Sequence, residues 1–263
     1  MHPEGPGPMD ELDRELETLQ HKAMSDGSDE ELLTDVGFMF DDCLEKVTCE
    51  FAYGTSSSGA PRVSVMLSYV QDNPGFVQSG HYVWPAAPAL CEYMVTNFES
   101  LPRGNVVELG AGCGLAGLVF AQLDPASRII FTDHDPGVLK TIEHNVTMQT
   151  HRAQATCHTQ SLRWGPEGAN EIEAIERVQS GQRATDLIVG TDVIYAREIV
   201  GLLFWTIDRL LASSGLFLMC SSFCYDDETE AEIDFMCTQY KLTRRIISCA
   251  LPTGTRIQIF TRQ

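Results

Sequence analysis

Apolar residues along the second half of the chain follow two alternating patterns. Short, largely apolar runs are typical of buried strands, and they predict strands at residues 105–109, 128–132, 155–162, 186–189 and 215–221. Between these runs apolar residues recur every three or four positions, which predicts a helix that ends at Leu123 and further helices at residues 136–148, 172–178, 199–211 and 229–239. Strands that alternate with helices form a parallel sheet covered on both faces, so we expect an α/β fold with a Rossmann-like sheet.

Two further strands close the chain and change the expected sheet. Residues 242–248 and 256–260 are β-like, and the segment between them holds Pro252-Thr-Gly-Thr255 but no helix. Because parallel neighbours need a long crossover, these two strands must form an antiparallel hairpin at the edge of the sheet. The expected sheet therefore has seven strands.

The N-terminal third of the chain lacks this alternation. β-like runs at residues 46–51 and 62–70 flank a Gly- and Ser-rich stretch, Gly54–Pro61, so a β-hairpin is expected within residues 37–80. A helix should begin near Pro85, because proline suits the first turn of a helix.

The charge of the chain is concentrated at its N-terminus. The 263 residues carry a formal net charge of −19, and residues 1–50 contain 15 acidic and 3 basic side chains, a net −12 that leaves −7 for residues 51–263. We therefore divide the chain into an acidic, flexible extension over residues 1–35 and one folded domain over residues 36–263. An acidic domain repels phosphate backbones and tolerates a basic partner, so a nucleic-acid partner is not expected.

Cysteines, apolar runs and the N-terminal sequence indicate the cellular compartment of the protein. The nine cysteines are scattered, odd in number and without a C-x-x-C pair, so neither a disulfide framework nor a metal site is indicated. No apolar run reaches the roughly 18–20 residues that span a bilayer. The N-terminal residues lack the basic and apolar regions of a secretory signal. We expect a protein of the cytoplasm or nucleus without a membrane partner; its oligomeric state stays open.

The strongest local motif is a glycine-rich turn between a strand and a helix. Residues 106–117 are Val-Val-Glu-Leu-Gly-Ala-Gly-Cys-Gly-Leu-Ala-Gly, so a ligand can approach the backbone amides without obstruction by side chains. In an open α/β sheet, ligands bind at this carboxyl end of the strands. A P-loop is excluded because Gly-Lys-Ser/Thr is absent.

Three interpretations of this turn remain open. Gly112–Gly117 satisfies the G-x-G-x-x-G fingerprint of nicotinamide and flavin cofactors, S-adenosylmethionine is the second candidate ligand, and packing of the helix on the strand is the third interpretation. Asp133, at the end of the next strand, suits ribose hydroxyls with either cofactor. Glu108 favours S-adenosylmethionine, because a carboxylate repels a pyrophosphate but attracts the sulfonium and ammonium of this cofactor.

Five segments together resemble one protein family. They are Val-Trp-Pro-Ala-Ala-Pro-Ala-Leu (83–90), the glycine-rich turn (106–117), Thr-Asp-His-Asp (132–135) with Asn145, Leu-Arg-Trp-Gly (162–165) and Asp-Leu-Ile-Val-Gly-Thr-Asp-Val-Ile-Tyr (186–195). From about residue 37 to the end, the chain resembles the methyltransferase-16 family of seven-β-strand methyltransferases, most of which modify protein lysines. The glycine motif is shared by many methyltransferases, whereas the Trp-Pro segment, the Leu-x-Trp-Gly segment and the Asp-x-x-Tyr motif together are much more specific. It implies that domain 36–263 is a class I methyltransferase domain with S-adenosylmethionine as cofactor.

The resemblance implies roles for residues around the methionine part of the cofactor. Trp84 would close over the cofactor, Gly110, Ala111 and Gly112 would follow its methionine part, and Glu108 would lie beneath. The alternative for Trp84 is that of a plain core aromatic residue.

Three more residues would hold the nucleoside part. Asp133 would bind the ribose, Trp164 would flank the adenine, and Thr191 would contact the cofactor through its backbone, at a position where the family often has alanine or serine. The alternatives are that Asp133 caps the following helix and that Trp164 only fills the core.

Asp192 and Tyr195 form an Asp-x-x-Tyr motif that the resemblance places beside the incoming nucleophile. Asp192 would hold the ammonium group of a lysine and orient its amine, and Tyr195 would wall the channel, with its ring face attracting the cation. The alternatives are that Asp192 binds backbone amides in a loop and that Tyr195 only packs.

The expected function is that of an S-adenosylmethionine-dependent protein-lysine N-methyltransferase, with a basic protein as a candidate substrate. Thr191–Tyr195 lacks the two prolines of Asn-Pro-Pro-Tyr, a segment typical of methyltransferases that modify DNA or glutamine. Three alternatives remain: a protein-histidine methyltransferase, a small-molecule methyltransferase, and a non-catalytic interaction module that only binds the cofactor.

Overall fold

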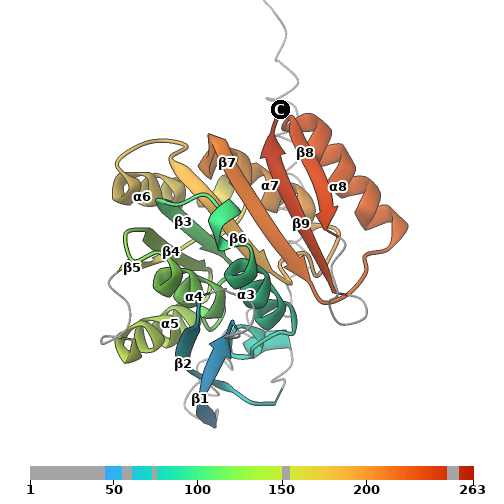
Figure 1. Ribbon diagram of the computed structural model, residues 1–263. Helices are drawn as coiled ribbons and strands as arrows, with labels where there is room; N and C mark the ends of the chain where they lie inside the picture. The colour runs from blue at the N-terminus through green and yellow to red at the C-terminus, as the bar shows by residue number, and fades with distance from the viewer. Residues whose placement is uncertain (1–44, 55–60, 73–75, 150–154, 248–254) are drawn as a thin grey trace, which may run out of the picture.

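Seven strands form one mixed sheet on which the rest of the molecule is built (Figure 1). The computed structural model describes residues 45–54, 61–72, 76–149, 155–247 and 255–263. In the order β5-β4-β3-β6-β7-β9-β8, the first five strands pair in parallel, and β9 is antiparallel to both β7 and β8. The predicted α/β class, the seven-strand sheet and its antiparallel C-terminal hairpin are confirmed. The strands are β3 (Asn105–Leu109), β4 (Arg128–Asp133), β5 (Thr156–Ser161), β6 (Thr185–Thr191), β7 (Leu211–Ser221), β8 (Leu242–Ile247) and β9 (Arg256–Arg262).

Helices cover both faces of the sheet, because successive side chains of a buried strand point to opposite sides. On β3, Val106 packs into a core shared with α3, α4 and α5, and its neighbour Val107 packs into a second core shared with α6, α7 and α8. None of the helices in the described ranges is long and apolar enough to cross a membrane. The helices are α3 (Ala86–Thr96), α4 (Leu115–Leu123), α5 (Pro136–Met148), α6 (Ala169–Gln179), α7 (Ile199–Leu210) and α8 (Asp227–Gln239).

The predicted start of β7 is wrong by several residues. The strand begins at Leu211 and not at residue 215, because Leu211 pairs with Thr185 on β6 before a register shift in the ladder. Ser213 and Ser214 lie in this stretch and are exposed. Two consecutive polar residues are typical of a loop, which is why the sequence did not indicate a strand there. A β-bulge thus extends the strand beyond its apolar part.

A separate two-stranded sheet precedes the main sheet. β1 (Lys46–Tyr53) and β2 (Val63–Val70) are antiparallel, so the predicted N-terminal β-hairpin is confirmed. The hairpin lies beside α4 and α5 (Figure 1), which β2 contacts directly. The extension predicted over residues 1–35 falls outside the described residues.

Side-chain amides from α4, from α5 and from the residue that caps the end of α5 pair with the second edge of β2. Each amide accepts a hydrogen bond from a backbone N–H of β2 and donates one to the C=O of the same residue, as a third strand would. The pairs are Gln122 with Ser64 (3.3 and 2.6 Å), Gln149 with Met66 (3.3 and 2.5 Å) and Asn145 with Ser68 (2.8 and 3.1 Å). Asn145 is fully buried, and its Nδ2 also donates to the carbonyl of Cys113 at 2.9 Å, which joins the hairpin to the glycine-rich turn.

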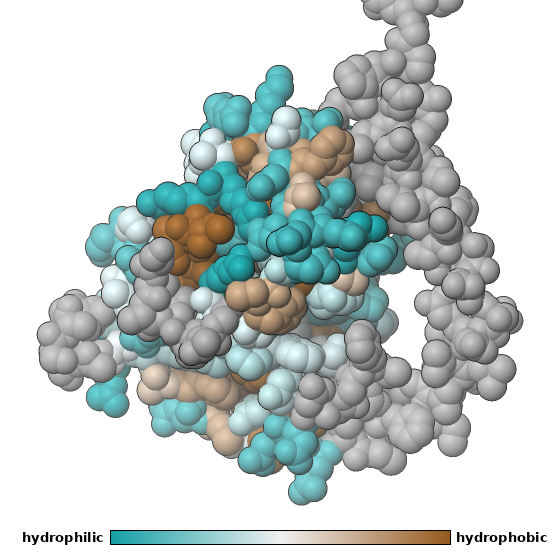
Figure 2. Space-filling view, turned by 90° about the vertical axis from the view of Figure 1, so that its right-hand side faces the viewer, coloured by the Kyte–Doolittle hydropathy of each residue, from teal (hydrophilic) through white to brown (hydrophobic). Residues whose placement is uncertain are grey.

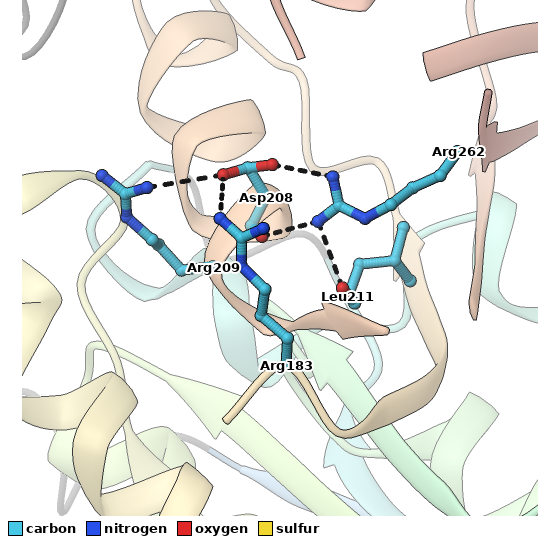
Figure 3. A network of polar contacts seen from close by, with 5 residues as sticks. All are labelled: Arg183, Asp208, Arg209, Leu211 and Arg262. Carbon is cyan, nitrogen blue, oxygen red and sulfur yellow. Dashed lines mark hydrogen bonds and ion pairs between the residues drawn. The ribbon is translucent and has the colours of Figure 1, made fainter. Parts of the chain in front are cut away.

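Three arginines surround Asp208 at the end of α7 (Figure 3). Arg262, on β9, donates to Asp208 Oδ1 at 2.8 Å and to the carbonyls of Asp208 and Leu211 at 2.7 and 3.1 Å. Arg183 and Arg209 reach Asp208 Oδ2 at 3.0 and 3.5 Å. Because the last carbonyls of a helix have no partners within it, Arg262 both satisfies them and ties the last strand to α7.

Asn145→Ala tests the attachment of the hairpin. The substitution leaves the N–H and C=O of Ser68 and the C=O of Cys113 without their buried partner, so the free energy of unfolding should fall by roughly 2–4 kcal/mol. Urea unfolding measures the change. The control variant Asn97→Ala removes a side-chain amide at the end of α3 that donates to the Tyr93 carbonyl. Its free energy of unfolding should fall by less than about 1 kcal/mol. Equal losses in the two variants would contradict this role of Asn145.

Candidate functional site

A cavity of about 350 Å³ lies at the carboxyl ends of β3, β4 and β6. This is the position that open α/β sheets use for ligands, and the volume is in the range of small-molecule sites. All ten residues singled out in the sequence line it: Trp84, Glu108, Gly110, Ala111, Gly112, Asp133, Trp164, Thr191, Asp192 and Tyr195. Residues from distant parts of the sequence thus line one cavity.

The glycine-rich turn needs its glycines for conformation and for space. Gly110 and Gly112 have φ values of +56° and +53°, in the left-handed region that favours glycine. A Cβ at Gly112 would also lie 3.1 Å from the carbonyl oxygen of Gly80. The segment that precedes α3 therefore approaches the turn closely and forms the opposite wall of the cavity.

Glu108 is buried at the floor of the cavity. Its Oε2 accepts the backbone N–H of Gly117 at 2.9 Å, in the first turn of α4. Burial raises the pKa of this carboxyl to about 8, although backbone hydrogen bonds from Gly117 and Ala116 oppose the rise. A cation in the cavity would favour the ionised form of Glu108, so the site suits a positively charged ligand.

Asp133 links two loops at the end of β4. Its carboxylate accepts the N–H of Gly112 at 3.2 Å and that of Asp135 at 3.1 Å. Burial raises the pKa of Asp133. The two backbone hydrogen bonds oppose this rise, and so does the charge of the adjacent His134. The residue that caps α5 is Asp135, which accepts from Gly137 and Val138, so Asp133 is not the helix cap.

The two tryptophans that line the cavity are only partly buried. Trp84 donates from Nε1 to the carbonyl of Ser79 at 3.1 Å and meets the ring of Tyr82 edge-to-face at 5.3 Å. The ring of Trp164 faces Gly110, where a Cβ would lie 3.3 Å from it, and it packs on the core behind. Trp164 thus lies between the core and the cavity, whereas Trp84 lines the cavity from the segment before α3.

Asp192 lies just after β6 in a left-handed conformation, with φ +52°. Oδ1 accepts the backbone N–H of Ser222 at 2.7 Å and its hydroxyl at 3.0 Å, and Oδ2 accepts the same hydroxyl at 2.9 Å and the N–H of Ala86 at 3.3 Å. Burial raises the pKa of Asp192, and these hydrogen bonds oppose the rise. Tyr195 lies on the same loop at the edge of the cavity, and the residue is 61% exposed.

Sequence reasoning missed several contributors to this site. Ser79 and Gly80 line the cavity, and Ser222 and Ala86 hold Asp192. Gly80 and Ala86 act through backbone atoms, for which no residue type is a signal. The signal for Ser222 was its position directly after β7, the strand that neighbours β6.

Comparison with known proteins identifies the family. A family model described as lysine methyltransferase matches residues 65–239, which is more than half of the chain. The chain belongs to this lysine methyltransferase family. The resemblance expected from the sequence is confirmed, and with it S-adenosylmethionine as the cofactor of the family.

Several curated proteins that are similar to this chain are named as lysine methyltransferases. METTL21E of Mus musculus is 28% identical over 154 residues, which cover 57% of this chain and 59% of the relative. METTL21A of Danio rerio is 30% identical over 145 residues (55% and 61%), and a calmodulin-lysine N-methyltransferase of Arabidopsis thaliana is 30% identical over 154 residues (57% and 46%). These matches span less than two thirds of the length of each relative.

Solved structures support the fold alone. Precorrin-6y C5,15-methyltransferase from Geobacter metallireducens is 12% identical with a TM-score of 0.50, covering 75% of this chain and 94% of that chain. A putative O-methyltransferase from Nostoc punctiforme is 17% identical with a TM-score of 0.50, covering 66% and 56%. This chain thus has the fold of class I methyltransferases.

The titration of Glu108 predicts how cofactor affinity depends on pH. A cation lowers the pKa of a neighbouring carboxyl, so binding of S-adenosylmethionine should release a proton from Glu108, and its Kd should rise as the pH falls below about 8. Calorimetric titrations between pH 6 and 9 measure the change, which has an upper limit of about tenfold per pH unit.

The variant Glu108→Gln is the control, because it keeps any titration of the ligand itself and removes that of the carboxyl. The variant should bind more weakly at pH 9 and lose the part of the pH dependence that Glu108 contributes. Identical pH profiles for both proteins would contradict the linkage.

Proposed function

We propose that this protein is an S-adenosylmethionine-dependent protein-lysine N-methyltransferase. The observation that carries the proposal is a single cavity in which the Asp192–Tyr195 motif faces the glycine-rich turn, in a chain of the lysine methyltransferase family. The relatives named above, which act on proteins, support a protein substrate.

In this proposal one part of the cavity holds the cofactor. Glu108 faces its charged methionine part, the backbone of 110–112 lies along it, and Asp133 binds the ribose hydroxyls. The side chains of Trp84 and Trp164 and the backbone of Thr191 complete this part. When bound, S-adenosylmethionine supplies an electrophilic methyl group on a sulfonium.

The other part of the cavity receives the acceptor lysine. A pH of 7 is about 3.4 units below the reference pKa of lysine, so deprotonation of the lysine ammonium at this pH costs roughly 4.6 kcal/mol. Asp192 attracts the ammonium and orients the amine, and the exposed ring of Tyr195 lies against the side chain of the lysine and attracts its cation. Partial removal of water within the cavity lowers the pKa of the lysine and so favours the neutral amine.

We also propose a basic substrate segment, because the loops around the cavity are acidic. Residues 133–135, 162–165, 192–198 and 222–228 contain seven acidic side chains and two arginines. Two of these acids, Asp227 and Glu228, lie in the first turn of α8, which also carries Glu230. The face of the molecule that carries α8 is largely hydrophilic, with small separate hydrophobic patches (Figure 2). Like-charged partners would be repelled from these loops, whereas basic segments would be attracted.

We place this activity in the cytoplasm or nucleus. The seven described cysteines are free thiols, as compartments with a reducing environment keep them.

Methyl labelling tests the proposed function. Purified protein and tritiated S-adenosylmethionine are added to a heated cell lysate, and the labelled residue is mapped by mass spectrometry. We expect the label on lysine within basic segments of a protein. Label on histidine or only on small molecules, or no label by a protein that binds the cofactor, would reject lysine methylation.

Asp192→Asn tests the acceptor role of the carboxylate. The substitution keeps the size of the side chain and one oxygen for the Ser222 N–H but removes the charge, so kcat/KM for the labelled protein should fall roughly 10²-fold. Kd for S-adenosylmethionine should change by less than about threefold. The control is Glu173→Gln, which neutralises an exposed acid of α6 outside the cavity and outside the acidic loops, and should retain activity. Wild-type kcat/KM in Asp192→Asn would remove this role.

A further inference from the structure

Ser222 makes more hydrogen bonds to Asp192 than any other residue in the described ranges. Its backbone N–H donates to Oδ1 at 2.7 Å, and its hydroxyl lies 3.0 Å from Oδ1 and 2.9 Å from Oδ2. The hydroxyl is therefore nearly equidistant from the two carboxylate oxygens, and a rotation of the carboxylate would break at least one of these contacts. No motif in the sequence points to this serine.

The sheet brings the two residues together. β6 and β7 are parallel neighbours, with Thr191 opposite Cys220, and the N–H of Asp192 donates to the Cys220 carbonyl at 2.9 Å. Asp192 thus continues the ladder by one bond and then turns away in a left-handed conformation. Aspartate adopts this conformation more readily than most residues, and its short side chain remains within reach of Ser222.

A third element meets the carboxylate. Oδ2 also accepts the N–H of Ala86 at 3.3 Å, at the start of α3. Trp84 lies two residues before Ala86 and lines the cavity. The carboxylate of Asp192 is therefore held between the ends of β6 and β7 and the segment that carries Trp84.

We propose that Ser222 is a positioning residue, which fixes the carboxylate of Asp192 in the orientation that receives the acceptor amine. The inference rests on the proposed function for its catalytic consequence, because Ser222 acts on the acceptor only through Asp192. Its geometric part does not depend on turnover. Hydrogen bonds donated to a carboxylate also favour its ionised form, so loss of the Ser222 hydroxyl should leave Asp192 harder to ionise.

The titratable groups around Asp192 come from several elements. Tyr195 lies on its own loop, Tyr225 lies before α8, and Asp133 lines the same cavity at the end of β4. Glu108 lies at the floor of the cavity, and from α3 the contact is the uncharged N–H of Ala86. None of these groups is a cation, so in the described part of the chain hydrogen bonds, and not an ion pair, oppose the rise in the pKa of Asp192 that burial causes.

The chain offers both a rescue variant and a matched control. Ser222→Ala removes the hydroxyl and keeps the backbone N–H, whereas Ser222→Thr restores a hydroxyl. Ser221→Ala removes the neighbouring hydroxyl, which is fully buried and makes no hydrogen bond to Asp192. A general loosening of the β7 end would affect both serine-to-alanine variants.

The first experiment measures the pKa of Asp192 directly. Full-length protein with ¹³C-carboxyl aspartate is titrated by NMR, and Asp192→Asn identifies the resonance. We expect Ser222→Ala to raise the pKa of Asp192 by about one unit, which means roughly tenfold less ionised carboxylate below both pKa values. Ser222→Thr should return it, and Ser221→Ala should leave it unchanged. An unchanged pKa in Ser222→Ala, or an equal shift in Ser221→Ala, would overturn the inference.

The second experiment measures methylation of the labelled protein against pH. In Ser222→Ala the acidic limb of the pH profile of kcat/KM should shift to higher pH by as much as the pKa measured by NMR rises. The Kd for S-adenosylmethionine should not change. If the wild-type protein labels no lysine, the proposed function fails and the catalytic role of Ser222 fails with it. If the wild-type protein labels lysine and Ser222→Ala matches its rate and pH profile, only the inference about Ser222 fails.

Discussion

The buried amide of Asn145 is the point at which three parts of the molecule are joined. It pairs with both backbone groups of Ser68 on β2 and with the carbonyl of Cys113 in the glycine-rich turn. The segment around Gly80 also contacts this turn directly, because the Sγ of Cys113 donates to the carbonyl of His81 at 3.2 Å. A Cβ at Gly112 would lie 3.1 Å from the carbonyl oxygen of Gly80, so the two walls of the cavity are in close contact at this point.

The charge state of the cavity follows from the burial of its acids. Glu108, Asp133 and Asp192 all line it, and burial raises the pKa of each. A carboxylate that loses water needs hydrogen bonds or a cation, and each of these acids already has backbone N–H donors. Those donors do not cancel the effect of burial on the pKa, so a cationic ligand would further stabilise the ionised form of each acid. A sulfonium beside Glu108 and an ammonium beside Asp192 would each supply such a charge, which is why one cavity suits both reactants.

Sequence reasoning found the elements because their apolar periodicity reflects burial on one or two faces. It also placed the last two strands correctly, since no crossover could fit between them. It misplaced the start of β7, where Ser213 and Ser214 continue a strand through a bulge without apolar side chains. Within the site, the motif residues could be named because chemistry restricts their types. Gly80 and Ala86 could not be found, because a backbone carbonyl or amide is present at nearly every residue, and only the fold selects which one is used.

The loop role and the acceptor role of Asp192 are compatible, although they were alternatives at the level of sequence. A carboxylate offers about four lone-pair positions. Three hydrogens are directed at it here, from the N–H of Ser222, the hydroxyl of Ser222 and the N–H of Ala86. About one position therefore remains, which is enough for a single N–H of an incoming amine. The bonds that hold the loop thus limit the carboxylate to one further donor and, because they fix its plane, also define the direction from which that donor can approach.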